Sequence, residues 1–327
     1  MKRKFLSIIL CALLSVLTLA GVTACNKSDE ISVYMPDGAP ALAMAQLMSE
    51  NKQFSKSVSY HVVSANTISS HVTYTDNDKN ADIIVMPVND ASKLLGDGSQ
   101  YKMLGTVTHG NLYIVANKDK EELTSLNFAE KIQGAKVGVV QLPMFPGVMF
   151  KTLLNKYSAE ATLSAVQPTL VDGNSSDYDY FVIPEPAAST RVGNAQFNLK
   201  IVGSVQTLYG EGGYPQAVLM AKSALIEKHP EFIAEFCSAL EGASNWLTSG
   251  DVTSDTILNA IKSHYVDPDN TEPAFKNLSP TIINNCAISF EYSKSCKSSV
   301  VSLLTEFKEV DGEFANIVGD NFFYIPA

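Results

Sequence analysis

The stretch VYMPDGAPALAMAQLM, from Val33 to Met48, begins like a buried strand and ends like a helix. Its first part is an apolar run closed by Pro36, and ALAMAQLM has helical periodicity. Between them, Gly38 lies between two prolines, which stiffen the backbone and are tolerated in the first turn of a helix. Such a turn either presents a helix N-terminus to a ligand or has only the structural role of connecting the strand to the helix. Other proline-containing turns of the chain help to decide between these two roles.

Strand and helix patterns alternate well beyond this stretch. ADIIVMP is a near-continuous apolar run, typical of a strand buried on both faces, and a helix pattern follows it. A second series starts at KVGVVQ and continues through YFVIPEPAAST and YPQAVLMAK, and helices dominate from about residue 223. Repeated strand–helix units predict mainly parallel sheets flanked by helices, and two series predict two α/β lobes.

The chain of 327 residues is long enough for two lobes. We expect it to cross between them twice, near residues 114–117 and 214–221. The first lobe is then discontinuous, with residues 31–113 and 218–327, and the second lobe comprises residues 114–217.

The N-terminus has the order of a secretory signal. The basic start MKRK precedes a short apolar segment, and Thr23 and Ala24 precede Cys25, as in a bacterial lipobox. We predict a signal peptide over residues 1–24, lipidation of Cys25 and a tether over residues 25–30. The protein would then be anchored by lipid on the extracytoplasmic face of the cell membrane. An ordinary signal peptide or an uncleaved anchor is the alternative.

Charge and composition exclude several functions. The net charge of −10 becomes −13 once Lys2, Arg3 and Lys4 leave with the signal, and an acidic surface repels nucleic acid. The five histidines are scattered without the spacing of metal ligands, so we expect no metal and no cofactor. Among the cysteines, Cys237 fits a core position. Whether Cys286 and Cys296 form a disulfide stays open at this point.

Four proline-containing turns stand where strands lead into helices: PDGAPA, PVNDAS, QLPMFPG and PEPAAS. Ligands of open α/β sheets bind outside the carboxyl ends of the strands, so these turns would face one another across a cleft. Met144 and Phe145 lie in the third turn, where apolar residues have no evident core role, and we interpret them as ligand contacts. Asp37 either caps its own helix or touches the ligand. THGN, residues 108–111, is either a polar contact near a hinge or a strand bend.

The lipobox, PDGAPALA, ADIIVMPVNDASKLL, GAKVGVVQLPMFPGVMFKTLL and YDYFVIPEPAAS resemble, in this order, the substrate-binding proteins of ABC importers. The nearest branch is the nitrate/sulfonate/taurine and thiamine-precursor-like group. The likeness covers nearly all of the chain after the signal and rests on the order and spacing of the motifs. It implies a type II periplasmic-binding-protein-like fold with a ligand cleft at the hinge. It also implies closure on a small molecule and delivery to a permease driven by a separate ATPase, without bond chemistry.

The resemblance and the turns together predict the ligand-binding residues. Carried over from the ligand-facing turns are Asp37, Gly38, Ala39, Pro40, Pro87, Val88, Asn89, Gln141, Pro143, Met144, Phe145 and Glu185. Aromatic and polar residues near the expected cleft add Tyr34, His109, Asn111, Tyr209 and Tyr214.

The ligand class is less clear from the sequence. The chain has two arginines, Arg3 in the signal and Arg191 on a predicted helix surface, so a bidentate clamp for a sulfonate is not expected. Aromatic rings and carboxylates suit a heterocycle or an amine better than a sulfonate or nitrate. Two alternatives remain: an enzyme on the same fold, with Asp37 and Glu185 as acid and base, and a ligand-sensing surface subunit. We expect a monomer.

Overall fold

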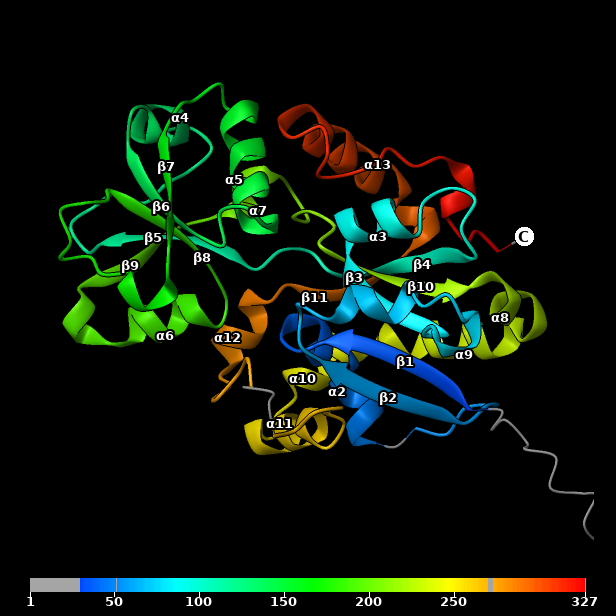
Figure 1. Ribbon diagram of the computed structural model, residues 1–327. Coiled ribbons are helices and arrows are strands. Elements are labelled where there is room, and N and C mark those ends of the chain that lie inside the picture. The colour runs from blue at the N-terminus through cyan, green and yellow to red at the C-terminus, as the bar shows by residue number, and fades with distance from the viewer. Residues whose placement is uncertain (1–29, 51, 270–272, 327) are drawn as a thin grey trace, which may run out of the picture.

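The computed structural model describes residues 30–50, 52–269 and 273–326, and it contains two β-sheets flanked by helices (Figure 1). The predicted signal peptide, Cys25 and the tether up to residue 29 lie outside the described residues. We call the first sheet with its helices the first lobe (residues 30–108 and 217–326) and the second sheet with its helices the second lobe (residues 112–209).

The first sheet has six strands in the order β11-β4-β10-β3-β1-β2. They are β1 (Ile31–Pro36), β2 (Val58–Val63), β3 (Ile83–Pro87), β4 (Tyr101–Thr108), β10 (Ala217–Lys222) and β11 (Ile288–Tyr292). Strand β1 runs parallel to β2 and β3, whereas β10 is antiparallel to β3 and β4, and β11 is antiparallel to β4.

The second sheet has five strands in the order β7-β6-β8-β5-β9. They are β5 (Leu112–Asn117), β6 (Lys136–Val140), β7 (Thr162–Val166), β8 (Tyr180–Pro184) and β9 (Leu199–Ser204). Strand β6 is parallel to β7 and β8, but β5 is antiparallel to β8 and β9. The predicted α/β class is confirmed, but the sheets are mixed rather than mainly parallel. The reason is that β5 and β10, which enter each sheet from the other lobe, and the edge strand β11 run against their neighbours.

Helices cover both faces of each sheet (Figure 1). In the first lobe, α2 (Ala39–Ser49), α9 (Pro230–Leu240), α10 (Ala243–Leu247) and α11 (Ser254–Lys262) pack on one face, and α3 (Val88–Leu94) and α13 (Ser293–Val310) lie on the other. The remaining helices of this lobe are α8 (Ser223–Lys228), α12 (Pro280–Asn285), η1 (Ile68–Val72), η2 (Asn77–Lys79) and η5 (Asp320–Phe322). The second lobe holds α4 (Phe128–Ile132), α5 (Phe145–Lys156), α6 (Ala187–Gly193), α7 (Val205–Tyr209), η3 (Pro168–Leu170) and η4 (Ala195–Phe197).

Two short passages connect the lobes. The chain leaves the first sheet after Thr108 and enters the second at Leu112, and it returns between Tyr209 and Ala217. These passages, residues 109–111 and 210–216, begin slightly before the crossings expected near residues 114–117 and 214–221. The shift arises because most of the residues expected to cross are already paired within the sheets as β5 and β10.

One buried cluster runs through both lobes. It contains Met86 and Val218 of the first sheet together with Ile114 and Val182 of the second. Phe307 of α13, which is fully buried, joins the two parts by packing on helix α5. The lobes are therefore held together by apolar packing as well as by the two passages.

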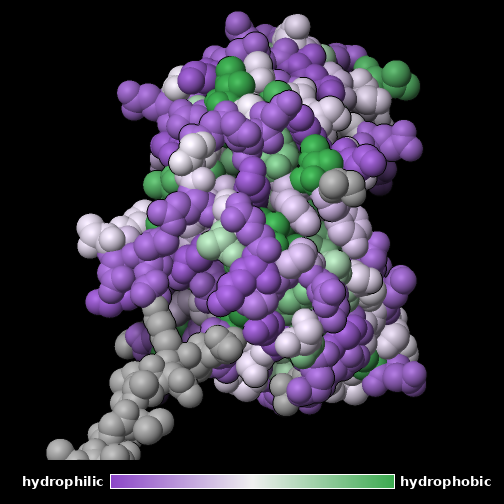
Figure 2. Space-filling model, turned by 90° about the vertical axis from the view of Figure 1, so that its right-hand side faces the viewer, coloured by the Kyte–Doolittle hydropathy of each residue, from purple (hydrophilic) through white to green (hydrophobic). Residues whose placement is uncertain are grey.

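The outer surface is largely polar. The face shown in Figure 2 is mostly hydrophilic, and its hydrophobic residues form small separate groups. Over the described part of the chain, helices that combine the length and the apolar character needed to cross a bilayer are absent.

Candidate functional site

The strand register places the predicted turns between the lobes. Ala217, where β10 begins, pairs with Pro87 at the end of β3 and with Thr108 at the end of β4. In the second sheet, Leu112 pairs with Pro184 at the end of β8. The passages therefore leave each sheet at the same edge as the carboxyl ends of β3 and β8. Because β1 is parallel to β3, and β6 to β8, all four turns lie at these facing edges.

The turn PDGAP has two consequences for helix α2. Gly38 is the N-cap residue and has a φ of 108°, a conformation that glycine adopts without strain. No side chain caps this helix within the described residues, and Pro40 lies in its first turn. The amide groups of the first turn are thus left without a side-chain acceptor. Ala39 is buried, and Gly38 and Pro40 are half-buried.

The Asp37 carboxylate accepts three hydrogen bonds within the first lobe. Its Oδ1 accepts a hydrogen bond from the Gly38 amide (2.8 Å), and its Oδ2 accepts from the Tyr265 hydroxyl (3.0 Å) and the Ala274 amide (2.8 Å). Asp37 therefore anchors the segment that follows α11 onto the first turn of the fold.

We expect Asp37→Ala to lower the free energy of unfolding by about 1–3 kcal/mol, because three donors lose their acceptor. Equilibrium denaturation with urea measures this loss. Tyr265→Phe, which removes one of the three bonds, should cost only a fraction of it. If Asp37→Ala unfolds at the same urea concentration as the parent but binds ligand more weakly, Asp37 touches the ligand instead.

A cluster of buried amides lies at the passages. Asn111 Oδ1 accepts from Gln216 Nε2 (2.9 Å), and the Val88 amide donates to the Gln216 carbonyl (3.0 Å). Asn89 follows Val88 at the start of α3 and donates to Asp90 through its side-chain nitrogen (3.0 Å). The side-chain oxygens of Asn89 and Gln216 are buried and accept no hydrogen bond from any described residue. Buried acceptors without donors are unfavourable, so a ligand or water that supplies N–H or O–H groups would stabilise this cluster.

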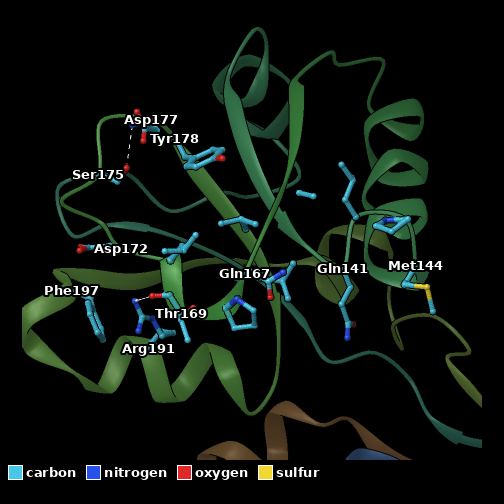
Figure 3. A pocket seen from close by; sticks show the side chains of 17 residues that line it. Gln141, Met144, Gln167, Thr169, Asp172, Ser175, Asp177, Tyr178, Arg191 and Phe197 are labelled. Atoms are coloured by element: carbon cyan, nitrogen blue, oxygen red, sulfur yellow. Dashed lines mark hydrogen bonds between the residues drawn. The ribbon is translucent and has the colours of Figure 1, made fainter. Parts of the chain in front are cut away.

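A cavity of about 940 Å³ lies in the second lobe at the ends of β6 and β7. The predicted residues Gln141, Pro143 and Met144 line one side of it. Figure 3 shows Gln141 and Met144 on this side, Gln167 near the middle, and Arg191 and Phe197 on the opposite side. The other wall was not predicted from the sequence, and it includes Gln167, Thr169, Asp172, Ser175, Asp177, Tyr178, Arg191 and Phe197. This wall comes chiefly from the connection between β7 and β8, where Pro168 begins only the three-residue helix η3 and the sequence patterns did not predict the strand before it.

Arg191 is not the surface side chain that the sequence suggested. Its Nε donates to the Val171 carbonyl (2.8 Å), and one terminal nitrogen donates to the Thr169 carbonyl (3.0 Å). The guanidinium lies 3.4 Å from the centre of the Phe197 ring, and burial lowers the pKa of Arg191 from its usual value. Carbonyl oxygens and a ring face thus hold the only arginine of the described residues.

Three predicted aromatic residues serve packing. The expectation that Phe145 lacks a core role is wrong, because its ring packs 5.3 Å from Phe307 and 5.9 Å from Tyr214. Tyr214 is fully buried and belongs to the core. The Tyr209 hydroxyl donates to Glu306 of α13 (3.2 Å) and so links the two lobes.

Tyr34 lies in the middle of β1, away from the turn that ends this strand. Its ring stacks between His61 and His71, with ring centres 4.4 and 4.3 Å apart. Burial raises the pKa of Tyr34 and lowers the pKa of both histidines. This stack consists of neutral rings on the face of the first sheet.

His109 opens the first passage and binds the edge strand β11. Its Nε2 lies 2.9 Å from the Thr106 hydroxyl and 3.4 Å from a Glu291 carboxylate oxygen, and its Nδ1 lies 2.9 Å from the Ser289 hydroxyl. Burial lowers the pKa of His109, although Glu291 opposes this shift. Residues 109–111 of THGN lie between β4 and β5, in the passage between the lobes, rather than in a bent strand. The His109 ring has three side-chain neighbours, and its amide donates to the Ala287 carbonyl.

Glu185 is buried and its carboxylate is occupied. One oxygen accepts from the Ser189 hydroxyl and from Asn285 Nδ2 (2.6 Å each), and the other accepts from the Ser189 amide (3.0 Å). Ser189 belongs to the second lobe, whereas Asn285 ends helix α12 of the first lobe.

The cysteine question is settled by the structure. Cys237, Cys286 and Cys296 are buried free thiols, so Cys286 and Cys296 do not form a disulfide. Burial raises the pKa of Cys237 and of Cys296 to about 12, which keeps both thiols protonated.

Several solved structures with the same fold are described as parts of ABC transport systems. An ABC transporter from Parabacteroides distasonis is 17% identical with a TM-score of 0.70, covering 92% of this chain and all of that one. The periplasmic aliphatic sulphonate binding protein SsuA from Escherichia coli is 11% identical with a TM-score of 0.64 (92% and 94% covered). The ligand binding component of an ABC-type import system from Staphylococcus aureus, solved with zinc bound, is 11% identical with a TM-score of 0.57 (91% and 97% covered).

At such low identities these similarities establish the fold alone. No protein-family model matches the chain, and no curated protein matches it either. The expected two-lobed fold is thus confirmed along nearly the whole length of the neighbouring chains.

Proposed function

We propose that this protein is the extracytoplasmic solute-binding component of an ABC importer and captures a small polar molecule between its lobes. The observation that carries the proposal is the position of the amide cluster at the passages. Two buried acceptors, Asn89 Oδ1 and Gln216 Oε1, lie where the facing edges of both sheets meet. Ligand sites of α/β folds lie at such strand ends. The solved structures of this fold add support through their transporter origin.

The ligand we favour is a heterocycle or an amine that donates hydrogen bonds. The amide oxygens at the passages accept such bonds. The cavity of the second lobe has a different lining, which also offers acceptors in Asp172, Asp177 and Tyr178. A sulfonate or nitrate would need a positive partner, but carbonyl oxygens already hold Arg191. The Escherichia coli neighbour is described as binding aliphatic sulphonates, so the ligand class is where we expect the two proteins to differ.

Transport follows from closure of the lobes about the two passages. Ligand enters while the lobes are apart, and the closed form docks on a permease whose ATPase supplies the energy. We propose that Cys25 carries the lipid anchor that keeps the protein at the membrane, and that it acts as a monomer. The enzyme alternative loses its support, because Asp37 and Glu185 are both occupied by structural hydrogen bonds and neither is placed as a free acid or base.

The proposal is tested by a thermal-shift screen of amines, nucleobases, vitamin precursors, sulfonates and inorganic anions. A ligand that binds only the folded state raises the melting temperature. A sulfonate hit would leave transport standing and overturn the ligand class. A screen without any hit, together with a neighbouring gene for a receptor kinase, would favour the sensing alternative.

For the best hit, we expect Asn89→Ala to weaken binding about tenfold or more and to lower the stability of the ligand-free protein by no more than about 1 kcal/mol. The reason is that the Asn89 side-chain oxygen has no donor within the described residues, so the free protein loses only the bond from the Asn89 side-chain nitrogen to Asp90. Titration calorimetry measures the dissociation constant, and thermal melting measures the stability. Lys93→Ala, at an exposed position one turn further along α3, serves as the matched control. A variant that loses stability but keeps its affinity would show that Asn89 is structural.

A further inference from the structure

Helix α12 ends at a residue that the second lobe binds twice. The side-chain nitrogen of Asn285 donates to the Glu185 carboxylate (2.6 Å), and its backbone carbonyl accepts from the Tyr113 hydroxyl (3.0 Å). Glu185 follows β8, and Tyr113 lies in β5, so both partners belong to the second lobe. Figure 1 shows α12 beneath this lobe, between α6 and the helices α10 and α11.

Both partners of Asn285 in the second lobe are buried. Glu185 is 5% exposed and Tyr113 is 7% exposed, and the Glu185 amide donates to the Asn111 carbonyl of the first passage (2.9 Å). On the other side, Cys286 is fully buried next to Asn285, and the Ala287 carbonyl accepts from the His109 amide (2.9 Å). The contact therefore joins α12 of the first lobe to the second lobe beside the first passage.

The charge of Glu185 makes this contact strong. Within the described residues no lysine, arginine or histidine forms an ion pair with it, so neutral donors from Ser189 and Asn285 stabilise the carboxylate. Ser189 moves with Glu185, since both lie in the second lobe. Asn285 is the donor that separates when the lobes part, and hydrogen bonds to a charged group are worth more than neutral ones.

We propose that Asn285 is a latch that holds the lobes in the closed arrangement and so sets the affinity of the cleft without touching the ligand. The statement about affinity rests on the proposed function, whereas the latch itself concerns the two lobes alone. The apparent affinity of a ligand scales with the population of the competent closed state. Loss of the latch should therefore weaken every ligand by the same factor.

The test uses Asn285→Asp, which keeps the shape of the side chain but places a second carboxylate against Glu185. Two exposed residues, Leu126 in the second lobe and Lys228 in the first, are each replaced by a ketone-bearing amino acid to which a dye is attached. Single-molecule FRET between the two dyes then measures the lobe separation in the ligand-free protein. At neutral pH we expect the closed-to-open ratio to fall about ten- to a hundredfold. Acidification, which protonates one carboxyl group, should restore closure in this variant only.

Two controls make the result specific. Asn284→Asp adds the same charge to the preceding residue, which is exposed, and should leave the ratio unchanged. Glu185→Gln combined with Asn285→Asp exchanges the amide and the carboxylate, and should restore closure. The latch is wrong if Asn285→Asp matches Asn284→Asp, or if the exchange pair stays open although it melts like the parent.

Affinity separates the latch from the proposed function. For any ligand found in the screen, Asn285→Asp should raise the dissociation constant by the factor by which the measured closed fraction falls. If the closed fraction falls but the dissociation constant does not change, the latch stands and binding between the lobes is wrong. If the lobes stay closed, the latch is overturned whatever the protein binds.

Discussion

Replacing Phe307 with alanine should lower the free energy of unfolding by about 3–5 kcal/mol, the usual cost of emptying the site of a buried phenylalanine. The side chain is fully buried in α13, and its ring packs 5.3 Å from Phe145 and 5.5 Å from Phe314. Because Phe145 belongs to the second lobe, the cavity would open in the apolar contact between the lobes. We therefore expect a second effect, a wider distribution of lobe separations, which FRET between the lobes measures alongside chemical denaturation.

Phe128→Ala is the matched control for this prediction. Phe128 is as deeply buried, but its ring contacts are with Phe150 and Tyr157 inside the second lobe. It should cost a similar free energy of unfolding and leave the lobe separation of the folded protein unchanged. Equal distributions for both variants would mean that Phe307 supports the first lobe only.

Gly213→Ala should destabilise the protein by about 2–4 kcal/mol, because strain and overlap act together. Gly213 has a φ of 75°, and a Cβ there would lie 2.1 Å from the His109 carbonyl oxygen of the other passage. The two passages touch at this point, where the Tyr214 amide also donates to the same carbonyl (3.2 Å). A methyl group would push them apart, and thermal or urea denaturation would register the loss.

Gly212→Ala separates strain from overlap. Gly212 has nearly the same φ, 79°, but a Cβ there would meet no described atom within 4 Å. It should cost only about 1–2 kcal/mol, the usual penalty of a left-handed residue with a side chain. If the two variants prove equally stable, the close approach of the passages is absent in solution.

The fold class was predictable because it follows from the order of strand and helix patterns along the sequence. The apolar runs at β3 and β6 and the helix patterns after them follow from periodicity, and they indicated two lobes. Strand direction was not predictable in the same way. Whether β5 and β10 run with or against their neighbours depends on which strands they join, and periodicity is the same in either direction.

The site was predictable only where a turn marked it. Gln141, Pro143 and Met144 line the cavity as their turn suggested, whereas Gln167 and Asp177 follow β7, a strand that the sequence patterns did not predict. Phe145 was misread because its partner Phe307 lies in a distant part of the chain. The roles of the carboxylates were equally hidden, since the donors to Asp37 and Glu185 come from residues beyond 260 as well as from their neighbours.

The strand order of the first sheet also has a consequence for the order in which the chain acquires its structure. Strand β10 lies between β3 and β4, so the sheet stays split until residues 217–222 have left the ribosome or a translocation channel. All strands of the second sheet lie within residues 112–204, so this sheet can form before any later part of the chain has emerged. During vectorial emergence the middle of the polypeptide would thus become a folded unit first, and the N-terminal strands would depend on the last third of the chain to complete their sheet.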